Sequence, residues 1–416
     1  MRKILLGTTG VVGAALIGMG AAQAQQAPTV RVGGFMQTTV AIVDDTLDST
    51  GAAPRGVAGV GTQSRNSTDF RNEVEIHVFV TGKAANGLSY GAVIEVQNDG
   101  TSGSVMDLDE AYVFVSSPTL GTIRFGEEDS AASIMQVRAP SITGFGSDGA
   151  FDVGILNNSA DRSGGNPSLL TGINDGSDAT KIIYLSPQFF GFDFGASYAP
   201  NAGEGDRAFN ARAVDTFGVA AGAAVPANNT QRDRTGLQNE MSAALRYRGT
   251  FGGVGIAAGF GYMQADAPEV TAAGAGITGT SRAQDVSAYT VGLNLSAFGL
   301  TVGGEYTWGK YTGAGVGRTA LANGRDESES WVLGATYVMG AFSVGAFYGA
   351  GTQDNGGTLA DREQTGWGIG AAYTVAPGLE VFANYNQFED KNVVIGSLAP
   401  QTRDFSAFFL GTRLAF

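Results

Sequence analysis

Segments in which apolar and polar side chains alternate recur along most of the chain. The segment DFRNEVEIHVFV (69–80) shows the pattern clearly, because Phe70 and Val78 share one parity while Glu75 and His77 share the other. Successive side chains of a β-strand point to opposite faces, so this segment predicts a strand with one apolar and one charged face. About sixteen such strands are predicted, and no helical periodicity competes with them after the first 24 residues. They cover 30–43, 69–80, 88–97, 109–117, 122–128, 180–187, 192–200, 237–249, 254–265, 284–296, 300–310, 328–339, 341–351, 362–375, 379–389 and 402–416.

The connections between these strands are alternately short and long. Short, tight connections such as QFFG (188–191) and APG (376–378) alternate with long polar ones such as 201–234. An even number of strands, short turns at one rim and long loops at the other are typical of a transmembrane antiparallel β-barrel. Tyrosine and tryptophan lie near strand ends, as the two interfaces of a membrane require; examples are Trp308, Trp331, Tyr373 and Tyr385. The apolar parity would then face lipid and the charged parity a water-filled lumen.

The first 24 residues differ from the rest. Arg2 and Lys3 precede an apolar run, and Ala22-Gln23-Ala24 follows it, so residues 1–24 are predicted to be a cleaved secretory signal peptide. Residues 25–416 would form one barrel domain with 23 basic and 39 acidic side chains, a net charge of −16. This acidity argues against nucleic-acid binding. The chain has no cysteine, which excludes a disulfide framework and thiolate metal sites.

The third long connection, 129–179, is the most informative one. It contains apolar pieces such as Phe145, Phe151 and Leu169-Leu170, which predict that it folds into the lumen. Acidic side chains of this loop and basic side chains of the strand walls would face each other across a constriction and create a transverse field. The alternative is that the charges are solvated and paired locally. The candidate acidic residues are Glu127, Glu128, Asp129, Asp148 and Asp152; the basic ones are Arg31, Arg71, Arg124 and Lys181; Glu73, Glu75 and His77 line the wall between them.

Other chemistry is sparse. A catalytic or metal-binding role for His77 would need partners, and the sequence contains no second histidine. We therefore expect no enzymatic activity, no resident metal and no cofactor. The acidic third loop could hold Ca²⁺ through carboxylate and backbone oxygens, although it lacks the spacing of an EF-hand. Glycine runs such as 313–317 lie in predicted loops and not between a strand and a helix, which excludes a phosphate-binding loop.

The chain resembles the general porins of Gram-negative bacteria, in particular those of alphaproteobacteria. The resemblance is carried by the signal, the alternating strands, the long third loop after GTIRFGEED, the segment KIIYLSPQFFGFDFGASYAP (181–200) and the terminal FFLGTRLAF. It implies an outer-membrane homotrimer with one pore per barrel, short periplasmic turns, long extracellular loops and a third loop that narrows the pore. It also implies that the barrel-assembly machinery reads the C-terminal strand through Phe408, Leu410, Leu414 and Phe416. The Pro-Glu-Phe-Gly-Gly element of enterobacterial third loops is absent, which leaves the roles of Asp148 and Asp152 open.

The function that follows is passive diffusion of small hydrophilic solutes and ions, with a preference for cations because acid exceeds base. A second hypothesis is a substrate-specific channel of the same fold, in which aromatic side chains form a stacking track. A third is a non-conducting structural or adhesive barrel, and a fourth is a membrane-embedded hydrolase. The track would use Phe35, Phe79, Phe382 and Phe388, and also Phe125 if the register of its strand slips.

Overall fold

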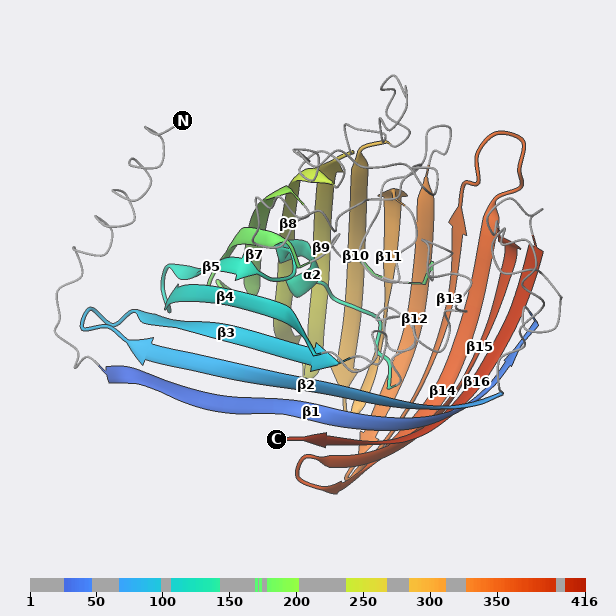
Figure 1. Cartoon of the computed structure of the whole chain (residues 1–416), viewed down its shortest axis with the longest axis horizontal. Helices are drawn as coiled ribbons and strands as arrows, with labels where there is room; N and C mark the ends of the chain where they lie inside the picture. Colours follow the sequence, from blue (N-terminus) through green and yellow to red (C-terminus); the bar gives the residue numbers. More distant parts are fainter. Residues whose placement is uncertain are drawn as a thin grey trace, which may run out of the picture.

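The chain forms a closed antiparallel barrel of sixteen strands in a computed structural model (Figure 1). Each strand pairs with its sequence neighbours, and β1 closes the ring by pairing with β16. The structure describes residues 26–46, 67–98, 106–142, 169–170, 172–173, 178–201, 237–267, 284–311, 327–393 and 401–416. The predicted signal peptide (1–24) lies outside the described residues.

The strands agree with the predicted ones to within a few residues at most ends. They are β1 (Gln26–Asp45), β2 (Thr68–Lys83), β3 (Ser89–Asn98), β4 (Asp107–Ser117), β5 (Gly121–Glu127), β6 (Thr180–Leu185), β7 (Phe192–Asn201), β8 (Gln238–Phe251), β9 (Val254–Asp266), β10 (Val286–Ala297), β11 (Leu300–Lys310), β12 (Ser328–Met339), β13 (Phe342–Gln353), β14 (Arg362–Ala376), β15 (Leu379–Val393) and β16 (Gln401–Ala415).

The two ends of the barrel differ in how the strands are joined. At the turn rim, where the short connections lie, residues with positive φ make the reversals; Gly299, for example, has φ +82° and follows Phe298 with φ 53°. The last residue closes this rim: Phe416 and Gly34 exchange backbone hydrogen bonds of 3.0 and 3.1 Å. The long connections all leave from the opposite end, the loop rim. The alternation of connection lengths therefore follows directly from the up-and-down strand order.

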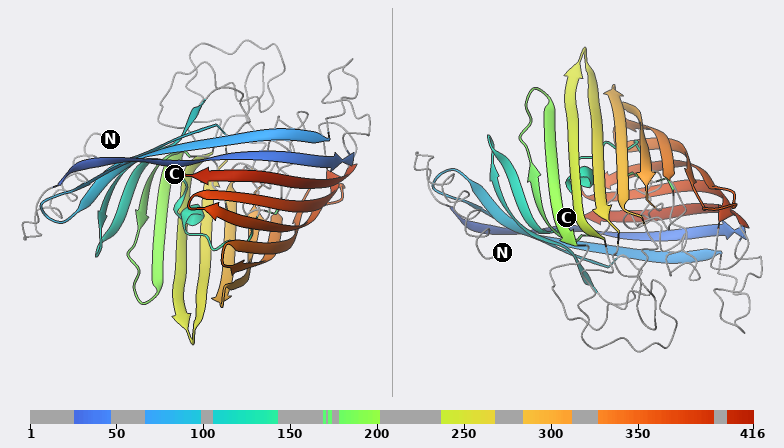
Figure 2. Two further views of the ribbon diagram at one scale, coloured as in Figure 1. Left: turned by 90° about the horizontal axis from the view of Figure 1, so that it is seen from below. Right: turned by 90° about the horizontal axis from the view of Figure 1, so that it is seen from above.

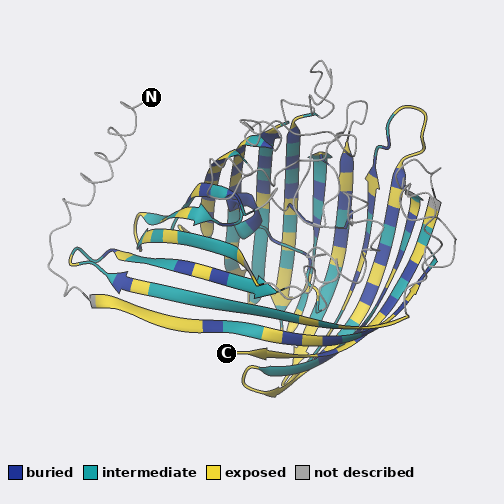
Figure 3. Ribbon diagram, in the orientation of Figure 1, coloured by how far each residue is buried: buried dark blue, intermediate teal, exposed yellow. Residues whose placement is uncertain are grey.

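Burial alternates along several strands, for example β7 and β14, as Figure 3 shows by colour. The apolar parity points outward: Val32, Phe70 and Phe125 are exposed on the outer face. The outer face also carries the four residues of the last strand that are expected to be read during assembly, and all four are exposed: Phe408, Leu410, Leu414 and Phe416. A barrel that exposes an apolar outer face is stable only where that face is covered by lipid or by another apolar surface.

Aromatic side chains form two belts on the outer face. Near the loop rim, Tyr289 stacks on Trp308 with ring centroids 5.4 Å apart. Near the turn rim, Phe342 lies 4.6 Å from Tyr373. Amphipathic rings at both edges of an apolar band mark the two interfaces of a bilayer. Tyr373 belongs to the turn-rim belt and Trp308 to the loop-rim belt, whereas Tyr385, expected near a strand end, lies near the middle of β15.

One short helix, α2 (Ala131–Ile134), interrupts the all-strand pattern. It belongs to the third long connection and lies inside the ring of strands in every view (Figures 1 and 2). The sequence predicted no helix there, because a single turn is too short to show a 3.6-residue period. Among the described residues, no helix has the length and the hydropathy needed to cross a bilayer.

Candidate functional site

The third long connection starts flush against the inner wall. The backbone N–H groups of Ala131 and Ala132 donate hydrogen bonds to the hydroxyls of Ser197 on β7 and Ser242 on β8, each at 3.1 Å. The two serine hydroxyls also lie 2.7 Å apart. Small polar side chains on β7 and β8 thus satisfy the exposed amide groups at the start of α2, which would otherwise be buried without partners.

Charged side chains hold the base of this loop. Lys181 is fully buried, and its Nζ donates to the backbone oxygen of Glu128 at 2.8 Å. Arg124 donates to Glu128 Oε1 at 2.8 Å, and Asp129 accepts from the Ser133 hydroxyl at 3.0 Å. Burial raises the pKa of Glu128, and the adjacent Arg124 guanidinium opposes that rise. We expected Arg124 and Glu128 to face each other across the pore, but they form a local pair on one side of it.

Glycines on the inner wall let the loop cross the barrel in close contact with the strands. A Cβ on Gly292 of β10 would lie 1.8 Å from the carbonyl oxygen of Val137, and one on Gly334 of β12 would lie 2.0 Å from that of Pro140. Any side chain at these positions would displace the loop backbone. Further inward glycines have loop atoms, mostly of side chains, within 4 Å of where a Cβ would lie: Gly195, Gly259, Gly261, Gly345, Gly349, Gly351 and Gly366.

Hydrogen bonds from strand side chains to the loop accompany these contacts. Each bond joins the loop to a different strand, from β10 to β14. They are Asn294 Nδ2 to the Arg138 oxygen at 2.9 Å, Gln136 Nε2 to Glu305 Oε2 at 2.8 Å, and the Leu169 N–H to Gln364 Oε1 at 2.7 Å. The described part of the loop therefore lies against the wall from β7 to β14.

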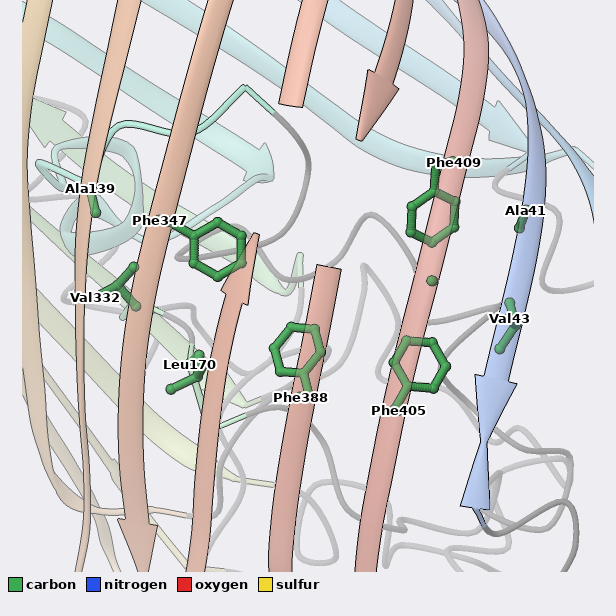
Figure 4. Close-up of a cluster of buried hydrophobic side chains, with 10 residues drawn as sticks. Ala41, Val43, Ala139, Leu170, Val332, Phe347, Phe388, Phe405 and Phe409 are labelled. Atoms are coloured by element: carbon green, nitrogen blue, oxygen red, sulfur yellow. The ribbon is translucent and has the colours of Figure 1, made fainter. Parts of the chain in front are cut away.

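An apolar cluster inside the barrel completes this attachment (Figure 4). Ala139 and Leu170 of the loop are buried with inward side chains of five strands. Phe388, one of the residues of the hypothetical stacking track, belongs to this cluster and is 6 % exposed, so its ring is unavailable to solutes. The strand residues of the cluster are Ala41, Val43, Val332, Phe347, Phe388, Phe405, Ala407 and Phe409.

The inward face of β1 to β4, with the turn half of β16, carries the charged wall. At its turn end, the Arg31 guanidinium lies 4.0 Å from the ring centroid of Phe79. The Arg413 guanidinium lies 3.9 Å from that of Phe35. These stacks hold two arginines flat against the wall. Arg31 therefore lies at the inner mouth, near the short turns, and not at the level of the third loop.

Carboxyl groups dominate the same wall nearer the loop rim. His77 on β2 lies between two of them: its Nε2 is 2.5 Å from Glu75 Oε1, and its Nδ1 is 3.3 Å from Glu95 Oε2. A β-bulge in β4 adds two more, because the register shifts between Ile94 and Val96 of β3. Two consecutive residues of β4, Asp109 and Glu110, then stand opposite Glu95, and Gln97 donates to Asp109 at 2.5 Å. We call Glu75, His77, Glu95, Asp109 and Glu110 the acidic edge.

The remaining predicted site residues have different positions. Arg71 and Glu73 lie on the charged wall, with Arg71 Nη2 4.0 Å from Glu73 Oε2. Glu127 was expected at the constriction, but the register places it in the outward row of Phe125, at the end of β5. That prediction was wrong because the alternation reverses the face between Glu127 and Glu128. Asp148 and Asp152, together with most of the acidic loop suggested for Ca²⁺, lie outside the described residues.

Sequence reasoning missed part of the site. Glu95 shares the inward parity of its strand, so it could have been found in the sequence. Asp109 and Glu110 could not both be assigned to the lumen, because strict alternation puts adjacent residues on opposite faces. Sequence reasoning also missed two ion pairs near the loop rim, Arg362 with Asp390 and Arg403 with Asp45. Each pair joins two neighbouring strands, so its partners are distant in the sequence.

A sequence profile for the family described as Gram-negative porin matches residues 10–393. No curated protein matches the sequence. Among solved structures, an OmpT of Vibrio cholerae, an outer membrane protein in its trimer form, superposes with a TM-score of 0.58 at 14 % identity, covering 94 % of this chain and 100 % of its own.

A second solved structure is the anion-selective porin from Comamonas acidovorans. It has a TM-score of 0.56 at 15 % identity, with 94 % of this chain and 100 % of that chain covered. A loop L8 deletion mutant of the Vibrio cholerae OmpT gives 0.57 at 16 % identity, with the same coverage. At such low identities these likenesses show the barrel fold alone.

Proposed function

This chain belongs to the Gram-negative porin family and is a channel of the outer membrane, and from that premise we propose that it passes small hydrophilic solutes and ions by diffusion with a preference for cations. In the orientation that we propose for the barrel, the short turns face the periplasm and the long loops face the outside of the cell. The acidic edge is the observation that carries the proposal. It places two carboxyl groups in contact with one histidine and two more on the adjacent strand, on the wall opposite the attached third loop.

Several basic side chains of the described lumen are held in other ways. Lys181 is buried under the loop, Arg124 pairs with Glu128, and Arg246 pairs with Asp193 at 2.7 Å. Arg31 is stacked on Phe79 at the inner mouth. Charge exposed at the narrow level of a pore, rather than total charge, biases which ions enter. The acidic edge therefore favours cations where it faces the lumen, while the inner mouth is basic.

The fold itself does not set the sign of this preference. The Comamonas acidovorans porin has the same barrel and is described as anion-selective. Selectivity in this fold must therefore come from the lumen side chains of each chain. For this chain, the acidic edge supports the cation preference, and a substrate-specific track finds less support because Phe125 points outward and Phe388 is buried in the loop contact.

We further propose that three copies assemble and that the barrel catalyses no reaction. The trimer form of the Vibrio cholerae OmpT supports the assembly. The hydrolase hypothesis requires a serine–histidine pair, whereas His77 contacts two carboxyl groups. The exposed row Phe408, Leu410, Leu414 and Phe416 supports recognition of the last strand by the assembly machinery. Mass measurement of the detergent-solubilised protein tests the trimer.

The zero-current potential of the purified protein in a planar bilayer under a KCl gradient tests the selectivity. We expect K⁺ to be favoured and the double variant Glu75→Gln/Glu95→Gln to lose part of that preference. One unit charge about 7 Å from a passing ion in water contributes about 0.6 kcal/mol, which is about a threefold change in local cation concentration. The double substitution removes the charge of the pair however a proton is shared between the two carboxyl groups.

The matched control is Glu363→Gln/Glu389→Gln. The same chemical change is made there on the outward parity of β14 and β15, near the loop rim. Equal potentials for both double variants would refute the role of the acidic edge. A preference for Cl⁻ in the unsubstituted protein would reverse the proposed sign, and a folded protein that conducts nothing would favour the non-conducting structural barrel.

A further inference from the structure

One group on the charged wall has the composition of a metal site. Glu75, His77 and Glu95 each offer a ligand atom, and these atoms lie within 4.8 Å of one another. Glu75 and His77 share the inward row of β2, and Glu95 stands directly opposite His77 on β3. The sequence could not show this, because it lacks a second histidine and the third ligand comes from the adjacent strand.

The donor set selects a class of ion. An imidazole nitrogen with two carboxylate oxygens suits Zn²⁺ and similar divalent transition metals, whereas Ca²⁺ and Mg²⁺ take oxygen ligands only. We propose that Glu75, His77 and Glu95 form a binding site for a divalent transition-metal ion on the pore wall. Two carboxylates also balance the two charges of the ion.

The local geometry fits such a site without movement of the backbone. Three protein ligands leave a fourth position for water, as in an open tetrahedral zinc site. The ligand atoms must approach to roughly 3.4 Å, the edge of a tetrahedron whose metal–ligand bonds are about 2.1 Å long. The side chains of Glu75 and His77 are part-exposed to the lumen, with 18 % and 23 % accessible, and Glu95 is buried with 11 % of its side chain accessible. Small rotations of the two exposed side chains can bring the ligand atoms together.

The surroundings also position the ligands. The ring of His77 stacks on Phe79 with centroids 5.7 Å apart, which restricts the rotation of the imidazole. One ring nitrogen binds the ion, and the carboxylate that now contacts the other ring nitrogen must rotate toward the ion. Asp109 and Glu110 lie beyond Glu95 on the bulged strand and add negative charge that attracts a cation to the site.

Isothermal titration calorimetry of the folded, detergent-solubilised full chain with ZnCl₂ tests the site. We expect one saturable site per chain that excess CaCl₂ does not displace. His77→Ala should weaken Zn²⁺ binding by about tenfold or more. The outward double variant Glu363→Gln/Glu389→Gln should bind as the unsubstituted protein does. Heat-dependent mobility in SDS gels verifies that each variant is folded.

Two results would overturn the proposal. One is equal Zn²⁺ binding by the unsubstituted protein and folded His77→Ala; the other is displacement of Zn²⁺ by Ca²⁺, which would indicate binding to carboxylates alone. If His77→Ala fails to fold, the same loss of affinity is required of Glu75→Gln/Glu95→Gln. The calorimetric test does not depend on conduction, so a folded chain that passes no current would refute the proposed function while leaving the metal site to be decided by binding.

Discussion

The close contact between Gly292 and the third loop leads to a specific prediction. In Gly292→Ala, the new Cβ would start 1.8 Å from the carbonyl oxygen of Val137, whereas real Cβ contacts are essentially never under 3.0 Å. The loop backbone must therefore move by at least 1.2 Å, the difference between these two distances, away from β10 and toward the charged wall. The nearby bond from Asn294 to the Arg138 oxygen is 2.9 Å long and would break after such a shift.

The expected cost is large enough to measure. Overpacking a close-packed site costs about 1–3 kcal/mol, and losing one hydrogen bond costs about 1 kcal/mol more. Since the loop moves into the lumen, single-channel conductance should fall and current fluctuations should increase. The measurements are single-channel recording in planar bilayers and urea unfolding in lipid vesicles.

Gly255→Ala is the matched control for this substitution. Gly255 lies on the inward row of β9, and the nearest atom to a Cβ there would be the Ser296 hydroxyl oxygen at 2.4 Å, a side-chain atom that can rotate away. We expect this variant to keep its conductance and stability. Unchanged conductance and stability in Gly292→Ala would refute the conclusion that the loop lies against β10.

Two further predictions concern the stability of the barrel. Asp390→Asn removes one partner of the buried pair with Arg362 and should destabilise the protein by about 3–5 kcal/mol. Glu389→Gln, in an exposed pair, should cost about 1 kcal/mol or less. Urea unfolding in lipid vesicles measures both. Equal effects would contradict the burial seen for Arg362. Leu410→Arg, on the outward row and at the expected bilayer midplane, should lower the free energy of unfolding by about 2–4 kcal/mol. Ser406→Arg, on the same row nearer the loop rim, should lower it by about 0–1 kcal/mol. The opposite order of the two effects would place the apolar band elsewhere.

The fold could be predicted from the sequence because its signal is local. In β2, the alternation from Asp69 to Val80 is enough to assign each residue to a face. The same parity rule assigned Arg31, Arg71, Glu75 and His77 to the lumen, where the structure also has them. Glu127 was assigned to the constriction as part of the acidic start of the third loop, whereas the parity of its strand, with Arg124 inward, gives the outward face that the structure shows.

The details of the site depended on contacts between distant segments. The path of the third loop is set by glycines on β9 to β14, and nothing in the loop itself names Gly292 or Gly334 as its neighbours. Pairing is also non-local: Glu95 meets His77 through the β2–β3 register, and the bulge that brings Asp109 and Glu110 together exists only in the paired sheet.

The sequence by itself thus determined a transmembrane barrel, its apolar outer face, its two rims and the sign of its overall charge. These properties follow from a two-residue period and from composition, which do not depend on partners. Only the tertiary structure decided which wall the third loop covers, which charges neutralise each other and which carboxyl groups surround His77. The physical reason is that hydrogen-bond register and close packing join residues far apart in the chain, and electrostatic interactions depend on the distances that result.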